Sequence, residues 1–159
     1  AGTIEEKKKI LFVQIIEISI FIVSQLILGG ISGAIMNVIS IIGNLLCYLD
    51  RLKLIPKILI TISSVIVVTI FNVQGAIGIL PLIAILTYLW LMNLKSVTKF
   101  KLLIIFVMIL WILYDFSIKS YTSTAFDVIT VISNMIAIIT IQIAKKKGLE
   151  ISYEKKGVV

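Results

Sequence analysis

The chain consists of long apolar blocks separated by short polar or glycine-containing breaks. Each block is about 20 residues long, the length of a helix that crosses the hydrocarbon core of a bilayer. The blocks do not alternate apolar and polar residues at period two, as transmembrane strands do. We expect an all-α, polytopic membrane helix bundle with six transmembrane helices over residues 10–28, 31–49, 55–71, 76–94, 100–118 and 125–144.

The charges between the blocks indicate an orientation. Lys and Arg gather before the first block and around the breaks after the second, fourth and sixth, whereas the breaks after the first and third carry no charge. Lys119, after the fifth block, is the exception among the 15 basic residues. Because positive loops stay on the cytoplasmic side, both termini are expected in the cytoplasm. Residues 1–159 would form one transmembrane domain, with 145–159 as a cytoplasmic tail.

Composition narrows the function. With 60% hydrophobic and 14% charged residues, the chain is too apolar for a soluble domain, which is about half apolar and a quarter charged. It has no histidine, and Cys47 is its single cysteine, so we expect neither an enzyme nor a metal or cofactor site. The net charge of +7 comes from basic clusters between blocks, which is a topology signal, and no nucleic-acid partner is expected.

An internal repeat appears when the chain is shifted by 90 residues. The segment 37–44 then aligns with 127–134, and the shift also pairs Gln25 with Asp115 and Phe21 with Trp111. Both members of each block pair cross the membrane in the same direction, which predicts a parallel repeat related by an axis along the membrane normal. This arrangement is similar to the three–one–three plan of SWEET-type carriers, and on that plan we expect the opening helix of the first triplet to be missing.

A distinctive set of residues occurs mainly in the second half of the chain: Leu80-Pro81, Trp90, the run Trp111-Ile112-Leu113-Tyr114-Asp115-Phe116, Ser120, Asp127 and Asn134, with Ala34-Ile35-Met36-Asn37-Val38-Ile39 in the first half. In these residues the chain resembles the YgjV family of bacterial inner-membrane proteins, and the likeness extends over about residues 8–146. The resemblance implies a location in the bacterial inner membrane. The family usually has Asn at the position of Asp115, Glu at that of Asp127, and one further N-terminal helix, which agrees with the incomplete first triplet.

Polar residues within the blocks are the candidate solute site. Asn37 and Asn44 lie seven residues apart on one helix face, and Asp127 and Asn134 repeat that spacing. We expect Asn44 and Asn134 to face each other across the repeat axis, with Asn37 and Asp127 lining the outer entrance. Trp111 would offer a face for stacking. The alternative is that the Asn side chains form hydrogen bonds that hold the helices together, and that Trp111 is packing.

Ionisable residues at membrane depth are costly and usually have a role. Asp115 and Glu17 are candidates for proton or ion coupling, and Asp127 for the solute path. The alternatives are pairing of Asp115 with Lys119, a pair or surface position for Glu17, and interaction of Asp127 with a helix dipole.

These features favour a membrane carrier for a small polar solute that works by alternating access around an axial polar site. The rival hypothesis is a membrane interaction protein, such as a scaffold or regulatory subunit. Its partners would be the lipid bilayer and either a second copy of the chain or a partner helix at the incomplete triplet. A polar cavity holding Asn44 and Asn134 together would favour the carrier, whereas amides bonded to neighbouring backbone would favour the scaffold.

Overall fold

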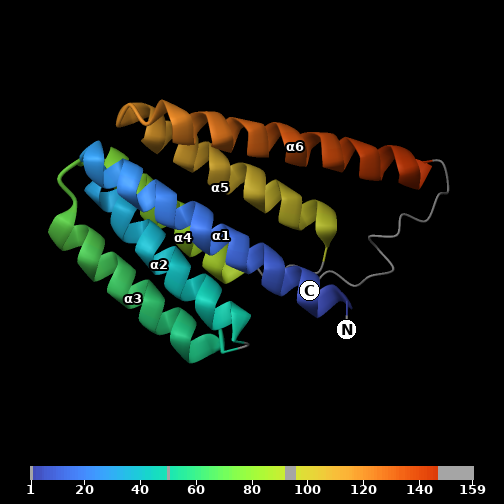
Figure 1. Cartoon of the computed structure of the whole chain (residues 1–159), viewed down its shortest axis with the longest axis horizontal. Helices are drawn as coiled ribbons and strands as arrows, with labels where there is room; N and C mark the ends of the chain where they lie inside the picture. The colour runs from blue at the N-terminus through green and yellow to red at the C-terminus, as the bar shows by residue number, and fades with distance from the viewer. Residues whose placement is uncertain (1, 50, 92–95, 147–159) are drawn as a thin grey trace.

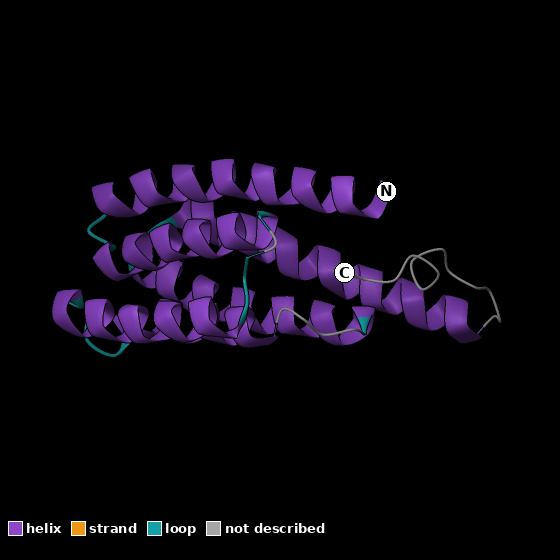
Figure 2. Ribbon diagram, turned by 90° about the horizontal axis from the view of Figure 1, so that it is seen from below, coloured by secondary structure: helices purple, strands orange, loops and turns teal. Residues whose placement is uncertain are grey.

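Every regular element in the described part of the molecule is helical. The computed structural model describes residues 2–49, 51–91 and 96–146, and no strand occurs in these ranges (Figure 2). The elements in chain order are α1 (Gly2–Ile27), α2 (Ile31–Tyr48), α3 (Leu54–Phe71), the 3₁₀ turn η1 (Ile77–Ile79), α4 (Leu80–Leu91), α5 (Val97–Ser117) and α6 (Tyr121–Lys146). The all-helical prediction is confirmed.

Four described helices are long and apolar enough to cross a membrane. The candidate spans are Ile31–Tyr48 in α2, Leu54–Phe71 in α3, Thr98–Ser117 in α5 and Tyr121–Ala144 in α6. The apolar stretches Ile15–Ile27 in α1 and Ile77–Leu91 in η1 and α4 are shorter. Between 17% and 33% of each full-length span is buried, so most of its surface faces outward, as expected of helices surrounded by lipid. Six crossings remain a prediction.

Four helices begin earlier than the apolar pattern predicts; α1 starts at Gly2 instead of residue 10, and α3 starts at Leu54 instead of residue 55. α5 starts at Val97 instead of residue 100, because the hydroxyl of Ser96 accepts a hydrogen bond from the backbone N–H of Lys99 and caps the helix. α6 starts at Tyr121 instead of residue 125. The fourth block opens as the turn η1, and Pro81 lies in the first turn of α4, where its missing N–H costs nothing.

Consecutive helices run in opposite directions, so the connections gather at two ends of the bundle (Figure 1). One end holds the α1–α2 turn, the α3–η1 loop and the α5–α6 turn. α5 packs against both α4 and α6, whereas α1 packs mainly against α2. The buried apolar core lies among α2, α3, α4 and α5 and consists of Met36, Val68, Ala84, Ile85, Leu103, Val107, Trp111 and Tyr114.

The α1–α2 and α5–α6 turns share one backbone geometry at positions 90 residues apart. The N–H of Gly30 donates to the carbonyl of Gln25 at 2.7 Å, and that of Ser120 donates to the carbonyl of Asp115 at 2.8 Å. Before each of these donors stands a residue in the left-handed region, Gly29 at φ 75° and Lys119 at φ 62°. Both turns are therefore Schellman motifs, which end one helix and reverse the chain into the next.

Candidate functional site

Polar side chains from four helices and one loop meet inside the bundle, near the end that holds these two turns. We call this group the polar cluster; it consists of Gln25 of α1, Asn37 of α2, Gln74 of the α3–η1 loop, Tyr114 and Asp115 of α5, and Asp127 of α6.

Gln25 is the centre of the cluster and is 1% exposed. Its amide nitrogen donates to Oδ1 of Asp115 at 3.0 Å, and its Oε1 accepts from the amide nitrogen of Asn37 at 2.8 Å. Because a carboxylate only accepts hydrogen bonds, Asp115 fixes which end of the Gln25 amide faces it. The Gln25 oxygen must then face Asn37, so the three side chains form one directed chain from α2 through α1 to α5.

Tyr114 joins α5 to α2 by a second route and is fully buried. Its hydroxyl accepts from the backbone N–H of Gly33 at 2.8 Å and lies 2.9 Å from Oε1 of Gln74, to which it donates. Gly33 is in the first turn of α2, where backbone N–H groups have no partner within the helix. Tyr114 therefore caps α2 from another helix, and only a glycine leaves room for its ring, which a Cβ at position 33 would overlap.

The α3–η1 loop, which contains Gln74, covers the cluster at the end of the bundle that holds the two turns. The side-chain oxygen of Asn72 accepts from the backbone N–H of Gln74 at 3.0 Å and from the hydroxyl of Ser32 at 3.3 Å. Its amide nitrogen donates to the carbonyl of Gly75 at 2.8 Å. A Cβ at Gly78 would overlap the Asn72 side chain, so this loop lies tightly against the start of α2.

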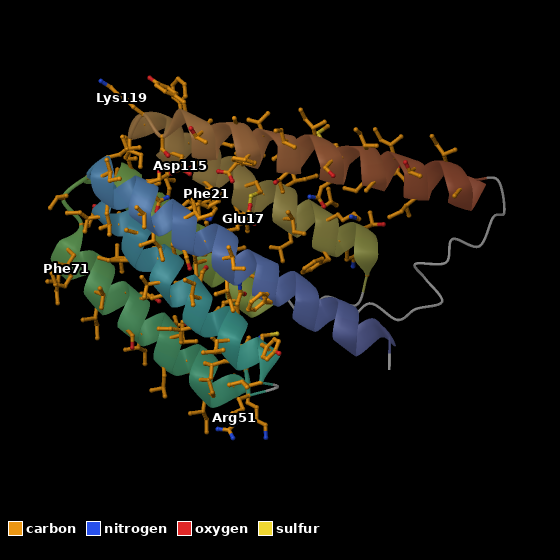
Figure 3. All side chains as sticks on the ribbon, viewed as in Figure 1. Glu17, Phe21, Arg51, Phe71, Asp115 and Lys119 are labelled. Atoms are coloured by element: carbon orange, nitrogen blue, oxygen red, sulfur yellow. The ribbon has the colours of Figure 1, made fainter. Side chains whose placement is uncertain are left out.

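Asp127 is buried, at 8% exposed, and its Oδ2 has no hydrogen-bond partner. The carboxyl groups of Asp115 and Glu17 both act on it electrostatically. Next to Asp127, the ring of Phe126 contacts that of Phe21 on α1, with centroids 6.3 Å apart. Figure 3 shows Glu17, Phe21 and Asp115 in a row along the boundary between α1 and the α5–α6 pair. Three carboxyl groups from α1, α5 and α6 thus lie near one another without a described cationic partner.

Asn44 and Asn134 lie in different surroundings. Asn44 is buried and borders a small cavity of about 20 Å³ lined by residues of α2, α3 and α4, such as Ile60 and Ile85. Such a space holds about one water molecule. Asn134 donates to the backbone carbonyl of Thr130 on its own helix at 2.9 Å and accepts from the Lys101 ammonium at 3.5 Å.

The expected facing of the two amides is therefore not found. Asn134 does not line the cavity that Asn44 borders, and its hydrogen bonds lead along α6 and to α5. The bond from Asn134 to its own backbone is the feature that the sequence analysis assigned to a scaffold.

The other candidate residues lie in the polar cluster, on the surface of α1 or in the apolar core. Asn37, Asp115 and Asp127 belong to the cluster, whereas Glu17 is exposed on α1. Trp111 is 7% exposed and meets Tyr114 edge-on with ring centroids 6.0 Å apart, so it is a core side chain with no free stacking face.

Gln25, Gln74 and Tyr114 were not among the candidate site residues. For Gln25 a signal was present, since the 90-residue shift pairs it with Asp115. Tyr114 lies in the run that carries the family resemblance, but nothing in that run indicated a role for its hydroxyl. Gln74 gave no signal, because glutamine is common in loops without a function.

A bundle with outward-facing apolar helices and a polar interior cluster defines the chain as a polytopic helical membrane protein. Residues 1–145 match the model of the Imp-YgjV family, whose members are described as bacterial inner membrane proteins. The chain belongs to this family, as the resemblance of its second half indicated. No curated protein and no solved structure matches the chain.

Proposed function

We propose that the protein is a carrier for a small polar solute and that the polar cluster around Gln25 and Asp115 is its axial site. The observation that carries the proposal is the hydrogen bond between these two side chains, which are 90 residues apart. In a parallel repeat, equivalent residues are related by the repeat axis, so they touch each other only when both lie beside it.

The matched turns support the same repeat. Four backbone bonds around the α1–α2 turn have counterparts 90 residues later around the α5–α6 turn, among them Leu28 to Ser24 and Ile118 to Tyr114, both at 3.1 Å. In the proposed carrier the α1–α2 pair and the α5–α6 pair rock against each other about this axis. The Gln25–Asp115 bond and the cap of Tyr114 on Gly33 then lie between the moving pairs, and solute would compete for them.

The proposed orientation places both termini in the cytoplasm, with six crossings. Among the described residues, Arg51, Lys53 and Lys99 lie near one end of the bundle, and Lys119 lies at the end that holds the cluster. This distribution follows the preference of basic residues for the cytoplasmic side, so the cluster would be near the periplasmic face.

The test is solute uptake into proteoliposomes containing the purified protein, with a panel of sugars, amino acids and organic amines at equal concentration. Gln25→Leu breaks both bonds of the central amide while keeping side-chain bulk. Asn134→Leu is the control, since it removes an amide of α6 outside the cluster. We expect at least one solute to be taken up by the native protein and by Asn134→Leu, with a loss of about tenfold or more in Gln25→Leu. Equal uptake in all three, or none above empty liposomes for any solute, would reject the carrier.

A second function, a membrane interaction subunit, is favoured by the neighbours of α1. α5 packs against two helices, whereas the face of α1 with Ile16, Ile20, Val23 and Ile27 is exposed. A second copy of the chain, or a partner helix, would cover this face. In a Cys47→Ala background, Val23→Cys should then form a disulfide-linked dimer in membranes, with Ile109→Cys on α5 as the exposed control.

A further inference from the structure

The two halves of the polar cluster differ in one chemical respect. In the half built on α1 and α2, the amide of Asn37 donates to Gln25 at 2.8 Å. The residues 90 positions later are Asp127 and Asp115, so both amides of the first half are carboxyl groups in the second. A carboxylate has no hydrogen to donate, and the place that an amide proton fills in the first half therefore has no donor in the second.

The environment of these carboxyl groups makes this absence costly. Asp115 is 2% exposed, and its described hydrogen bond comes from the uncharged amide of Gln25. Asp127 is 8% exposed with its Oδ2 unpartnered. Two carboxylates that repel each other in a low-dielectric interior, one of them with an unpartnered oxygen, are a high-energy arrangement.

No described basic side chain compensates them. The charged groups that act on Asp127 are Asp115 of α5 and Glu17 of α1, and Tyr114 adjoins Asp115. Among the described cations, Lys101 bonds Asn134, two helical turns further along α6, and Lys119 is exposed on the turn. The surplus of acceptors around Asp127 therefore calls for a positive charge that the described side chains do not supply.

We propose that Asp115 and Asp127 bind one exchangeable cation, a proton or a sodium ion, held between the two carboxyl groups. A sodium ion would place a positive charge where the first half has an amide hydrogen. A proton would place there a hydrogen shared by two carboxyl oxygens. Glu17 stands nearby on α1, beside the Phe21–Phe126 contact, and attracts the cation toward the pair.

The binding site needs no solute movement, whereas its role as the coupling site of transport rests on the proposed carrier function. In a carrier, binding of the cation would remove the repulsion between Asp115 of α5 and Asp127 of α6. It would therefore favour one of the two arrangements that the α1–α2 and α5–α6 pairs adopt as they rock against each other. Energy stored in a cation gradient would then act on the solute that occupies the Gln25 side of the cluster.

The experiment is thermal unfolding of the purified full chain in detergent, first with sodium, potassium and choline chloride at constant ionic strength and pH, then over a pH series at fixed salt. A ligand that binds only the folded state should raise the Tm by about 3 to 5 °C for each tenfold increase in its activity above the Kd. A response to sodium alone identifies a sodium site, and a response to acid alone identifies a proton site.

Asp127→Asn is the decisive variant, because its amide can donate to Asp115 as Asn37 does to Gln25. We expect it to fold, to unfold at a higher Tm than the native protein when cations are scarce, and to lose the cation response. Asp115→Asn keeps an acceptor for Gln25 and should lose the response as well, which provides a second measurement if the first variant fails to fold. Asn134→Leu, which removes an amide outside the cluster, is the control and should keep the response.

The site would be overturned if the Tm of the native protein responds to neither cation. It would also be overturned if Asp127→Asn and Asp115→Asn respond as strongly as the native protein. Infrared difference spectra of the carboxyl carbonyl band provide an independent check of a proton, and calorimetric titration with sodium chloride checks an ion. Cation binding without solute uptake would reject the carrier and leave the site standing. Solute uptake without a cation response in detergent would reject the cation site and leave the carrier standing.

Discussion

Replacement of Gly33 by alanine tests whether the packing of α2 against Tyr114 holds the polar cluster together. A Cβ at this position would overlap the Tyr114 ring and lie 2.9 Å from Oε1 of Gln25. Both neighbours are fully buried, so neither can move aside without disturbing its own hydrogen bonds.

The expected magnitude follows from three contributions. Overpacking a filled interior costs about 1 to 3 kcal/mol. Loss of an interhelical hydrogen bond, such as that from the Gly33 N–H to Tyr114, costs about 0.6 kcal/mol in a membrane protein. Alanine within a helix gains about 0.5 to 1 kcal/mol over glycine, so the net destabilisation should be about 1 to 3 kcal/mol.

A matched control lies ten residues further along the same helix. A Cβ at Gly43 would meet only Leu89, at an ordinary 3.9 Å, so Gly43→Ala should stabilise the protein by about 0.5 to 1 kcal/mol through the helix preference of alanine. Reversible unfolding in mixed detergent micelles, followed by helical circular dichroism, measures both variants. If the two substitutions shift stability in the same direction by the same amount, the close contact of α2 with Tyr114 is refuted.

Three further changes have definite signs. Lys119→Gly should stabilise the protein by about 1 kcal/mol, since an L residue pays for the left-handed conformation that glycine adopts freely, and Gly29→Ala should destabilise it by a similar amount. Unfolding under the same conditions measures both. Tyr114→Phe leaves the Gly33 N–H and the Gln74 side chain without their partner and should cost about 1 to 3 kcal/mol. Faster hydrogen exchange at the start of α2 would accompany this loss, and an unchanged exchange rate would argue against the cap.

The helices could be predicted from the sequence because apolar blocks of this length have few other stable forms in a bilayer. Their starts were harder to place. Lys99 resembles a loop residue by composition, yet α5 already includes it, since Ser96 caps the helix three residues before Lys99. Long lysine side chains can follow an apolar helix and place their charge at its end, so charge marks the membrane boundary more reliably than it marks the end of the helix.

The repeat alignment identified Gln25 and Asp115 as equivalent, but it could not show that they touch. Contact depends on how each helix is rotated about its own axis, and a shift of the sequence contains no information on that rotation. For Asn44 and Asn134 the same equivalence led to a wrong geometric expectation. Asn44 lies seven residues beyond Asn37, at a level where α2 packs between α3 and α4, so its side chain borders their cavity instead of the repeat axis.

The two halves of the cluster are alike in backbone and unlike in chemistry, and this combination is informative about function. Packing alone would tolerate the Asn37–Gln25 pair in both halves, since the turns that position them have the same hydrogen bonds. The carboxyl group of Asp127 leaves a buried oxygen unpartnered, which costs stability. A departure from symmetry that makes the folded state less stable is more readily explained by a ligand that removes the cost when it binds. The acidic half is therefore where an external positive charge would act, and the amide half is where an uncharged polar solute could exchange hydrogen bonds.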